Sequence, residues 1–515
     1  MSPSELESDT YDVVVIGTNL SGSIVAASLA KAGKSILHID PNEYYGSSHS
    51  SLTLDELIQW SSLHSSPSLT SHQYSQASTS TLTPSLHSDR RRYALSLYPA
   101  ILPSRGSMIQ TLIDSEVSKY VSFRLLGSVS VYNSTQPLNS SGEKEETGMV
   151  KNSKEVKVRR VPGSKEDIFK DTSINLRDKR KLMKFLLWAS GSYEITTVFM
   201  ENKHKRMGEF LKDVFGLDVK LADQICYAIA HCDDPEEKVE RVLGRMNRYL
   251  KSIGRYGSGA FLVGQYGSAG EVAQGFCRAC AVYGGTYVLG PSAKLESISA
   301  SEDGVILRLP CHPRDIKASK VISTAEHLPE NLRPAAAEVI ITTAQCIAIL
   351  PSFPELLRQS RGSSEGTQTE EEGSEENEDT AVLLFPPEGE MGLVRALIMG
   401  EGTGSCPPRQ WILYLSSVVS ESTPPKCLEP YLSRLSSEPL FSAFYFSHRP
   451  KYDIPAEKLL PSDKNIVLLR PCESLDMTEG MDWEAKQAEA AFWQVVGKDG
   501  QVGYFEKTEE GEESE

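Results

Sequence analysis

The stretch from Tyr11 to Tyr45 constrains the fold more than any other part of the chain, because it reads strand, tight turn, helix, strand. Residues 12–16 form a short, β-branched and apolar run, as expected for a strand that is buried on both faces. The run stops at Gly17, the apolar residues from 20 to 32 recur at helical spacing, and a second strand ends in the carboxylate of Asp40. This order predicts a βαβ unit of the dinucleotide-binding type.

The glycine fingerprint of this unit is incomplete. Gly17 and Gly22 hold its first and third positions, but Asn19 holds the second, so a side chain projects where a pyrophosphate would lie. The helix N-terminus and Asp40 remain available for a nucleotide. One interpretation is that Asn19 adopts an unusual backbone angle and a cofactor still binds. We favour the other, a flavoprotein-like scaffold without flavin, in which Gly17, Asn19, Gly22 and Asp40 are vestigial and no cofactor is held.

Length and charge limit the possible architectures and partners. A chain of 515 residues exceeds one ordinary core, so we expect two domains that are interleaved in sequence. A formal net charge of −16 and a pI near 5.3 disfavour nucleic acid and anionic lipid as main partners. The sequence has no apolar run of membrane-spanning length and no signal-peptide core at its N-terminus. We therefore expect a soluble, cytoplasmic protein.

The nine cysteines are scattered, and their odd number is typical of a reducing compartment. Cys277 and Cys280 form a C-x-x-C pair, but the pair lies within a helical pattern and no second pair completes a zinc site. We interpret both as packing residues. No metal site and no catalytic set of nucleophile and base is predicted.

Composition shifts divide the chain into an α/β, Rossmann-type multi-sheet domain and a smaller all-helical domain. The first domain resumes after the helices, and a late strand and helix return to complete the first sheet. The predicted divisions are 1–160 for the first part of the sheet domain with a disordered Ser/Thr/His-rich insertion at 61–88, 161–253 for the helical domain, 254–505 for the return with an acidic disordered insertion at 360–379, and 506–515 for an acidic tail.

A helix predicted over residues 271–283 has two different faces. At 100° per residue, Glu271, Gln274 and Arg278 fall on one face, and apolar residues from Val272 to Tyr283 fall on the other. Such a charged face is an ordinary solvated surface or a binding surface, and periodicity alone does not distinguish the two.

Several blocks, in the same order, resemble the superfamily of Rab GDP-dissociation inhibitors and Rab escort proteins. They are GTNLSGSIVAASLAKAGKSILHIDPNEYYG, YPAILPSRGSMIQTLIDSEVSKYVSF, VPGSKEDIF with KRKLMKFL, and GRYG followed by GEVAQGFCRACAVYGGTYVL. The resemblance implies an FAD-binding-like multi-sheet domain with a helical domain. It also implies binding of Rab GTPases in their GDP form rather than of a flavin.

By motif, the resemblance places Tyr45, Arg255, Glu271, Arg278 and Tyr287 in the family's Rab-binding platform. The charged helix face derived above contains two of these residues. The chain departs from the family in having a serine after Gly46, where a second glycine is usual, and in an extra residue between Arg255 and Glu271.

The VPGSKEDIF block resembles the escort branch, because Phe169 stands where escort proteins place an aromatic that docks on the prenyltransferase, and Arg180 matches the accompanying arginine. The resemblance implies a non-catalytic partner of the Rab geranylgeranyltransferase α/β heterodimer. Such a protein shelters the geranylgeranyl lipid on Rab and contacts membranes transiently. Apolar stripes on the helices between Asn175 and Ile253 are the expected walls of a lipid pocket. The alternatives are a dissociation inhibitor, an FAD-dependent oxidoreductase and, for Phe169, a place in the helical core.

Overall fold

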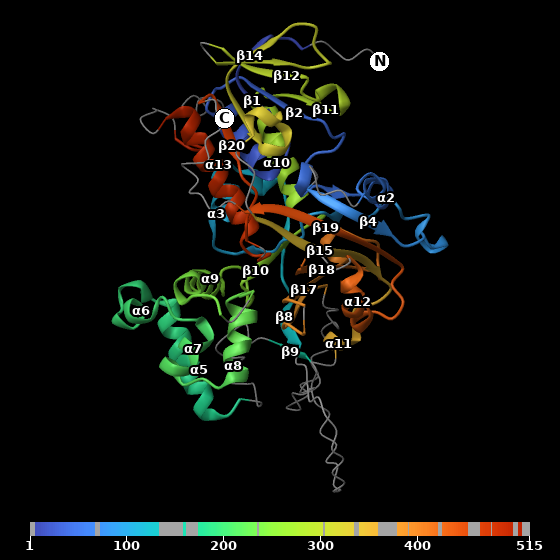
Figure 1. The fold of residues 1–515 in the computed structure, drawn as a ribbon. Helices are drawn as coiled ribbons and strands as arrows, with labels where there is room; N and C mark the ends of the chain where they lie inside the picture. Colours follow the sequence, from blue (N-terminus) through green and yellow to red (C-terminus); the bar gives the residue numbers. More distant parts are fainter. Residues whose placement is uncertain are drawn as a thin grey trace, which may run out of the picture.

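The computed structural model describes residues 6–66, 73–132, 158–160, 174–233, 236–301, 304–333, 339–358, 379–389, 391–420, 425–451, 464–474, 476–497 and 503–506. Figure 1 shows one sheet with its helices at one end of the molecule, and a helical unit beside a second large sheet at the other end.

The first sheet is centred on the predicted N-terminal strand. Its order is β11-β2-β1-β14-β13-β12, and β20 pairs with the second half of β14. The strands next to β1 are parallel to it, as the βαβ prediction requires, and β20 is the expected late return of the chain. The bounds are β1 (Thr10–Ile16), β2 (Ile36–Asp40), β11 (Thr286–Leu289), β12 (Ser297–Ser301), β13 (Gly304–Arg308), β14 (Ile316–Thr324) and β20 (Ile466–Leu469).

Helix α1 (Leu20–Lys31) is almost wholly buried because two further helices pack against it. These are α10 (Ala269–Val282) and α13 (Gly480–Val496), which come from the middle and the end of the chain. Helix α3 (Ser107–Asp114) packs in turn on α13. Helices from distant parts of the sequence therefore cover the N-terminal βαβ unit, which was predicted from its local sequence pattern.

The second sheet has the order β4-β19-β15-β18-β17-β16-β8-β9. Helices α11 (Glu355–Arg358) and α12 (Glu429–Leu435) accompany it, and Figure 1 shows α12 beside its central strands. The bounds are β4 (Tyr74–Thr79), β8 (Ser128–Tyr132), β9 (Val158–Arg160), β15 (Val339–Leu350), β16 (Thr380–Phe385), β17 (Val394–Gly400), β18 (Trp411–Val418) and β19 (Phe441–Lys451).

The tract 61–88 is not the disordered insertion that we predicted. It contains the end of α2 (Leu54–Leu63) and the edge strand β4, which pairs antiparallel with β19. Tyr74 is buried, and its ring lies 5.0 Å from Trp60 and 5.9 Å from Tyr445. A polar composition misled the prediction, because an edge strand is held by backbone pairing and one aromatic anchor rather than by an apolar repeat. The predicted insertion 360–379 and tail 506–515 lie almost entirely outside the described residues.

Two small sheets join these parts. The first is β6 (Leu102–Pro103), β10 (Phe261–Gly264) and β7 (Phe123–Leu125), and the second is β3 (Ser51–Leu52) with β5 (Leu95–Ser96).

The named elements among the described residues from 176 to 252 are all helical. Asn175 caps the first of them, as predicted, by accepting a hydrogen bond from the Asp178 amide. The apolar core of this helical unit is continuous with one face of the second sheet. Within the described residues, no helix is long and apolar enough to cross a bilayer. The helices are α5 (Leu176–Ser190), α6 (Thr197–Asn202), α7 (Met207–Phe215), α8 (Val219–Gln224), which continues into a π-helical turn (Ile225–Ile229), and α9 (Val239–Ser252).

Candidate functional site

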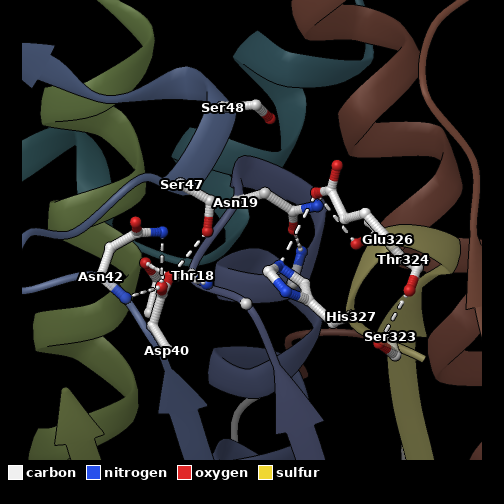
Figure 2. Close-up of polar contacts among 12 residues, drawn as sticks. Thr18, Asn19, Asp40, Asn42, Ser47, Ser48, Ser323, Thr324, Glu326 and His327 are labelled. Atoms are coloured by element: carbon white, nitrogen blue, oxygen red, sulfur yellow. Dashed lines mark hydrogen bonds and ion pairs between the residues drawn. The ribbon is translucent and has the colours of Figure 1, made fainter. Parts of the chain in front are cut away.

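The loop after β1 is closed by side chains of this chain. Gly17 has φ +93°, and a Cβ there would lie only 2.8 Å from Nε2 of His327, which packs against the loop (Figure 2). Asn19 has φ −60°, so the interpretation that it adopts an unusual backbone angle is wrong. Its Oδ1 instead accepts a hydrogen bond of 2.8 Å from Gly22 N and caps α1.

The carboxylate of Asp40 is buried and fully engaged, contrary to the expectation that it remains available for a nucleotide (Figure 2). Its Oδ2 accepts hydrogen bonds from Thr18 N at 2.7 Å, Thr18 Oγ1 at 2.6 Å and Ser47 Oγ at 2.6 Å. Its Oδ1 accepts from the backbone and side-chain nitrogens of Asn42 at 2.8 and 2.9 Å. Ser47 has φ +47°, which a glycine adopts more readily, and its hydroxyl bond to Asp40 compensates for the strain.

The hydrogen bonds of the loop after β1 and of Asp40 show whether this site can hold a dinucleotide. The first amides of α1 face protein groups, since Gly22 N donates to Asn19 and Leu20 N lies 3.5 Å from Nδ1 of His49. The acidic residue that would bind a ribose is saturated internally. The residues present therefore do not fit a flavin dinucleotide.

The outward face of α10 carries the predicted polar residues. Arg278 is exposed, and its guanidinium carbon lies 4.7 Å from the ring centroid of Tyr120, a residue that the sequence did not single out. Glu271 is half-buried, and burial raises the pKa of its carboxyl group above the ordinary value. No cation of the described residues forms an ion pair with Glu271. A charge that is partly desolvated and unpaired is better stabilised when a partner supplies a donor.

Tyr45 and Tyr287 are in contact, with ring centroids 5.9 Å apart and an edge-to-face orientation. The hydroxyl of Tyr287 lies 3.1 Å from Nδ1 of His38, whose Nε2 lies 2.9 Å from the carbonyl of Gly17. Burial raises the pKa of Tyr287 well above its ordinary value and lowers the pKa of His38 to about 4. Tyr287 therefore supports Tyr45 from below rather than presenting its own hydroxyl.

The remaining predicted platform residue is separate from this group. Arg255 is exposed in the connection between α9 and β10, and its Nη1 donates to the carbonyl of Ser104 at 2.7 Å. Its guanidinium also lies 5.2 Å from the ring centroid of the neighbouring Tyr256. None of its recorded contacts is with α10. The predicted platform residues thus form two pairs, Glu271 with Arg278 on α10 and Tyr45 with Tyr287. Arg255 belongs to neither pair.

The helical unit holds the other predicted positions. Arg180 is exposed on α5, and Phe169 lies outside the described residues. A small apolar hollow with a volume of about 30 Å³ lies between α5 and α8, and Arg159 and Arg160 of β9 also line it. The sequence analysis expected apolar stripes on these helices to form the walls of a lipid pocket but did not name the individual residues, and part of this wall is a π-helical turn. The apolar wall residues are Ile174, Leu182, Leu221, Ile225 and Ile229.

Cys277 and Cys280 are both buried in α10, in agreement with their interpretation as packing residues, and Sγ of Cys277 lies 3.2 Å from Oγ of Ser23. Among the described residues, no group of three metal-ligating side chains is close enough together to hold an ion.

A family model described as GDP dissociation inhibitor matches residues 7–354. The chain is 28% identical over 421 residues to Rab proteins geranylgeranyltransferase component A of Saccharomyces cerevisiae, which covers 79% of this chain and 62% of the yeast protein. It is 27% identical over 494 residues to Rab escort protein 1 of Arabidopsis thaliana, with 84% of this chain and 81% of the plant protein covered. The chain thus spans less than two thirds of the yeast relative and most of the plant one.

The fold is similar to that of a solved Rab GDI from Plasmodium falciparum, with a TM-score of 0.65 and 19% identity over 97% of this chain and 100% of that one. The predicted fold class, a Rossmann-type multi-sheet unit with a smaller helical unit, is confirmed.

Proposed function

The chain belongs to the GDP dissociation inhibitor family, and we propose that within this family it acts as a Rab escort protein. In this role it binds a GDP-loaded Rab GTPase, presents the Rab tail to the geranylgeranyltransferase heterodimer and delivers the lipidated product to membranes. It is an accessory protein without catalysis of its own.

The observation that carries this proposal is the apolar hollow in the helical unit. Exposure of a twenty-carbon geranylgeranyl chain to water costs on the order of 10 kcal/mol, so a protein that handles such a product must shelter it. The hollow is lined by apolar side chains from two helices and by two arginines. Its apolar lining is suited to contact part of a lipid chain.

The outward face of α10 supports the Rab-binding part. Glu271 and Arg278 are seven residues apart, two turns of helix, and so share a face, and neither forms an ion pair with a described residue. Tyr45 lies beside this helix on the support of Tyr287. A partner with complementary charges gains bonds to both groups without first breaking an internal salt bridge.

The escort role is favoured over that of a dissociation inhibitor by the names of the relatives in yeast and Arabidopsis. Arg180 is exposed on the first part of α5, where a transferase can reach it. Together with Phe169 it forms the proposed transferase contact.

Reconstituted prenylation tests the proposal. The transferase, an unmodified GDP-loaded Rab and labelled geranylgeranyl diphosphate are incubated with and without this protein. We expect lipid transfer only when the protein is present. Release of an already prenylated Rab from membranes, without support of prenylation, would identify a dissociation inhibitor, a role that the family description also fits. A flavin absorbance band that survives dialysis would support the oxidoreductase alternative.

A further inference from the structure

A second, polar cavity lies between the two large sheets, far in sequence from the residues used above. Its volume is about 40 Å³, and the exposed side chain of Val418 forms part of its lining. It is lined from the second sheet by Thr343, Gln345, Arg395, Ser416, Val418 and Arg449, and from the connections of the first sheet by Leu97, Tyr98, Pro99, Ser474, Asp476 and Met477.

The polar lining interrupts an apolar sheet face. Gln345, Ser416 and Arg395 lie opposite one another on the neighbouring strands β15, β18 and β17, so their side chains form one row across the sheet. Two residues further along, the corresponding row on the same face is Ile347, Tyr414 and Leu397, all buried in the core. Polar side chains on a core-facing row are costly to bury unless they form hydrogen bonds. A bound ligand would supply the partners that these side chains need.

Several of these polar groups form no hydrogen bond with another described residue. Thr343 is 3% exposed, and its hydroxyl forms no hydrogen bond with any described residue. The side chains of Gln345 and Ser416 likewise have no recorded hydrogen bond within the described ranges. In contrast, the carboxylate of Asp476 already accepts bonds from the amide and the hydroxyl of Thr478, at 3.0 and 2.7 Å. These hydroxyl and amide groups can each donate a hydrogen bond to a ligand.

The lining carries two guanidinium groups, on Arg395 and Arg449, and one carboxylate, on Asp476, so positive charge is in excess. Arg395 is buried and paired with Asp233. Arg449 forms no ion pair with a described residue; it donates to the carbonyl of Ser474 at 3.1 Å and lies 5.5 Å from the ring centroid of Tyr98. Of the two guanidinium groups in the cavity, the one on Arg449 is thus without a carboxylate partner among the described residues.

We propose that this cavity binds a carboxylate group, which Arg449 holds by charge-assisted hydrogen bonds and which Thr343, Gln345 or Ser416 completes. A planar carboxylate matches the fork of a guanidinium group and accepts further bonds from hydroxyl and amide donors. The carboxylate belongs either to a free organic acid or to the C-terminus of a polypeptide. This site is independent of the proposed binding of Rab by α10.

The test uses the intact protein and three probes at equal ionic strength: succinate, triglycine and triglycine amide. Calorimetry and melting curves measure binding. We expect succinate or triglycine to bind and to raise the melting temperature, and the amide to bind at least about tenfold more weakly than triglycine. Preference for succinate identifies a free acid, and preference for triglycine a polypeptide terminus. Absence of binding by both acids overturns the proposal, and so does binding of triglycine amide as tight as that of triglycine where triglycine binds.

Two substitutions assign the site. Arg449→Met should weaken acid binding at least about tenfold, and Arg434→Met is the matched control, because Arg434 also lies 5.0 Å from a tyrosine ring but outside the cavity. Thr343→Val should raise the melting temperature of the free protein, since it removes a buried unpartnered hydroxyl, and weaken acid binding about threefold or more. Unchanged affinity in both cavity variants contradicts the assignment.

Discussion

Arg278 lies over the ring of Tyr120, with 4.7 Å between the guanidinium carbon and the ring centroid. The contact joins helix α10 to the connection that follows α3 and holds a long side chain in one orientation at an exposed position. A cation that is held by an aromatic face loses less conformational freedom on binding a partner than a free one. The pair is thus suited to present a charge to another protein.

The first prediction concerns this charge. Arg278→Ala should weaken binding of GDP-loaded Rab by about 1.5 to 3 kcal/mol, roughly tenfold or more, because charge-assisted contacts are removed. Gln274→Ala is the matched control, since Gln274 is exposed between Glu271 and Arg278 on the same face. Titrations of both folded variants against Rab measure the difference. Equal affinities would mean that this face of α10 is ordinary surface.

The second prediction concerns the closed glycine loop. Asp40→Asn should lower the free energy of unfolding by at least about 3 kcal/mol, because an amide cannot accept all the bonds that the buried carboxylate accepts. Asp12→Asn serves as the control, because Asp12 accepts two bonds from Ser35 at a half-buried position. The loss of unfolding free energy in Asp12→Asn should be smaller than that in Asp40→Asn.

Urea unfolding of both variants measures this difference, and equal stabilities would contradict the structural role assigned to Asp40. The wild-type protein is also expected to purify without a flavin absorbance band, because Asp40 and Asn19 are engaged within the protein.

Buried histidines provide the third prediction. Burial holds the pKa of His38 and of His231 at about 4, whereas the unfolded chain has a histidine pKa of about 6.5. Between these values the unfolded state binds more protons than the folded state. The stabilisation is therefore complete above about pH 6.5 and declines by about 1.4 kcal/mol per pH unit and per histidine as the pH falls toward about 4.

Urea unfolding at about pH 7 and about pH 5 measures this dependence. His38→Gln should remove about half of the difference in unfolding free energy between the two pH values, because His231 still titrates. His87→Gln should leave it intact, because His87 is exposed. A stability of the wild-type protein that does not change with pH in this window would show that neither histidine is held neutral by burial.

The sequence predicted those parts of the fold whose signals are local. The turn at Gly17, the helix after it and the cap at Asn175 each depend on residues a few positions apart, and the structure has all three. Strand β4 was missed because its partner β19 lies more than 360 residues away, and a Ser/Thr-rich edge strand has no apolar alternation of its own.

In the candidate site, too, features that depend on neighbouring residues were predictable and features that depend on tertiary contacts were not. The positions of Glu271 and Arg278 on one face follow from helical geometry alone. The partner of Arg278, Tyr120, was not predictable, because tertiary packing brings the connection after α3 to α10. The bonds that saturate Asp40 also come partly from Ser47, whose backbone conformation is unusual for a serine. A pattern can show which residues share a face, but not which donors a carboxylate meets.

The fourth prediction tests the apolar hollow. Leu221→Phe should partly fill it and weaken retention of geranylgeranylated Rab by about tenfold, since excluding two or three methylene-sized groups costs about 2 kcal/mol. Binding of unprenylated Rab should stay unchanged. Leu187→Phe is the control, because Leu187 is exposed on α5 outside the hollow. Equal retention by both variants would place the lipid elsewhere.

The last prediction separates an escort protein from a dissociation inhibitor. Phe169→Ala should weaken the complex with the transferase roughly thirtyfold or more, because truncation of an aromatic anchor commonly costs about 2 kcal/mol or more. Arg180→Ala should act in the same direction, since this exposed side chain is free to approach a partner from α5. Rab binding and the melting temperature should hardly change in either variant.

Arg241→Ala is the control, because Arg241 is an equally exposed arginine on another helix of the same unit, α9. Each variant is titrated against the transferase and against Rab, and its melting curve is measured. Loss of an interface anchor lowers the transferase affinity, whereas loss of a core residue lowers the melting temperature. A lower melting temperature for Phe169→Ala together with undiminished transferase affinity would make Phe169 a core residue. The protein would then be better described as a dissociation inhibitor, since a chain that binds Rab and lipid but not the transferase can recycle prenylated Rabs and cannot present new ones.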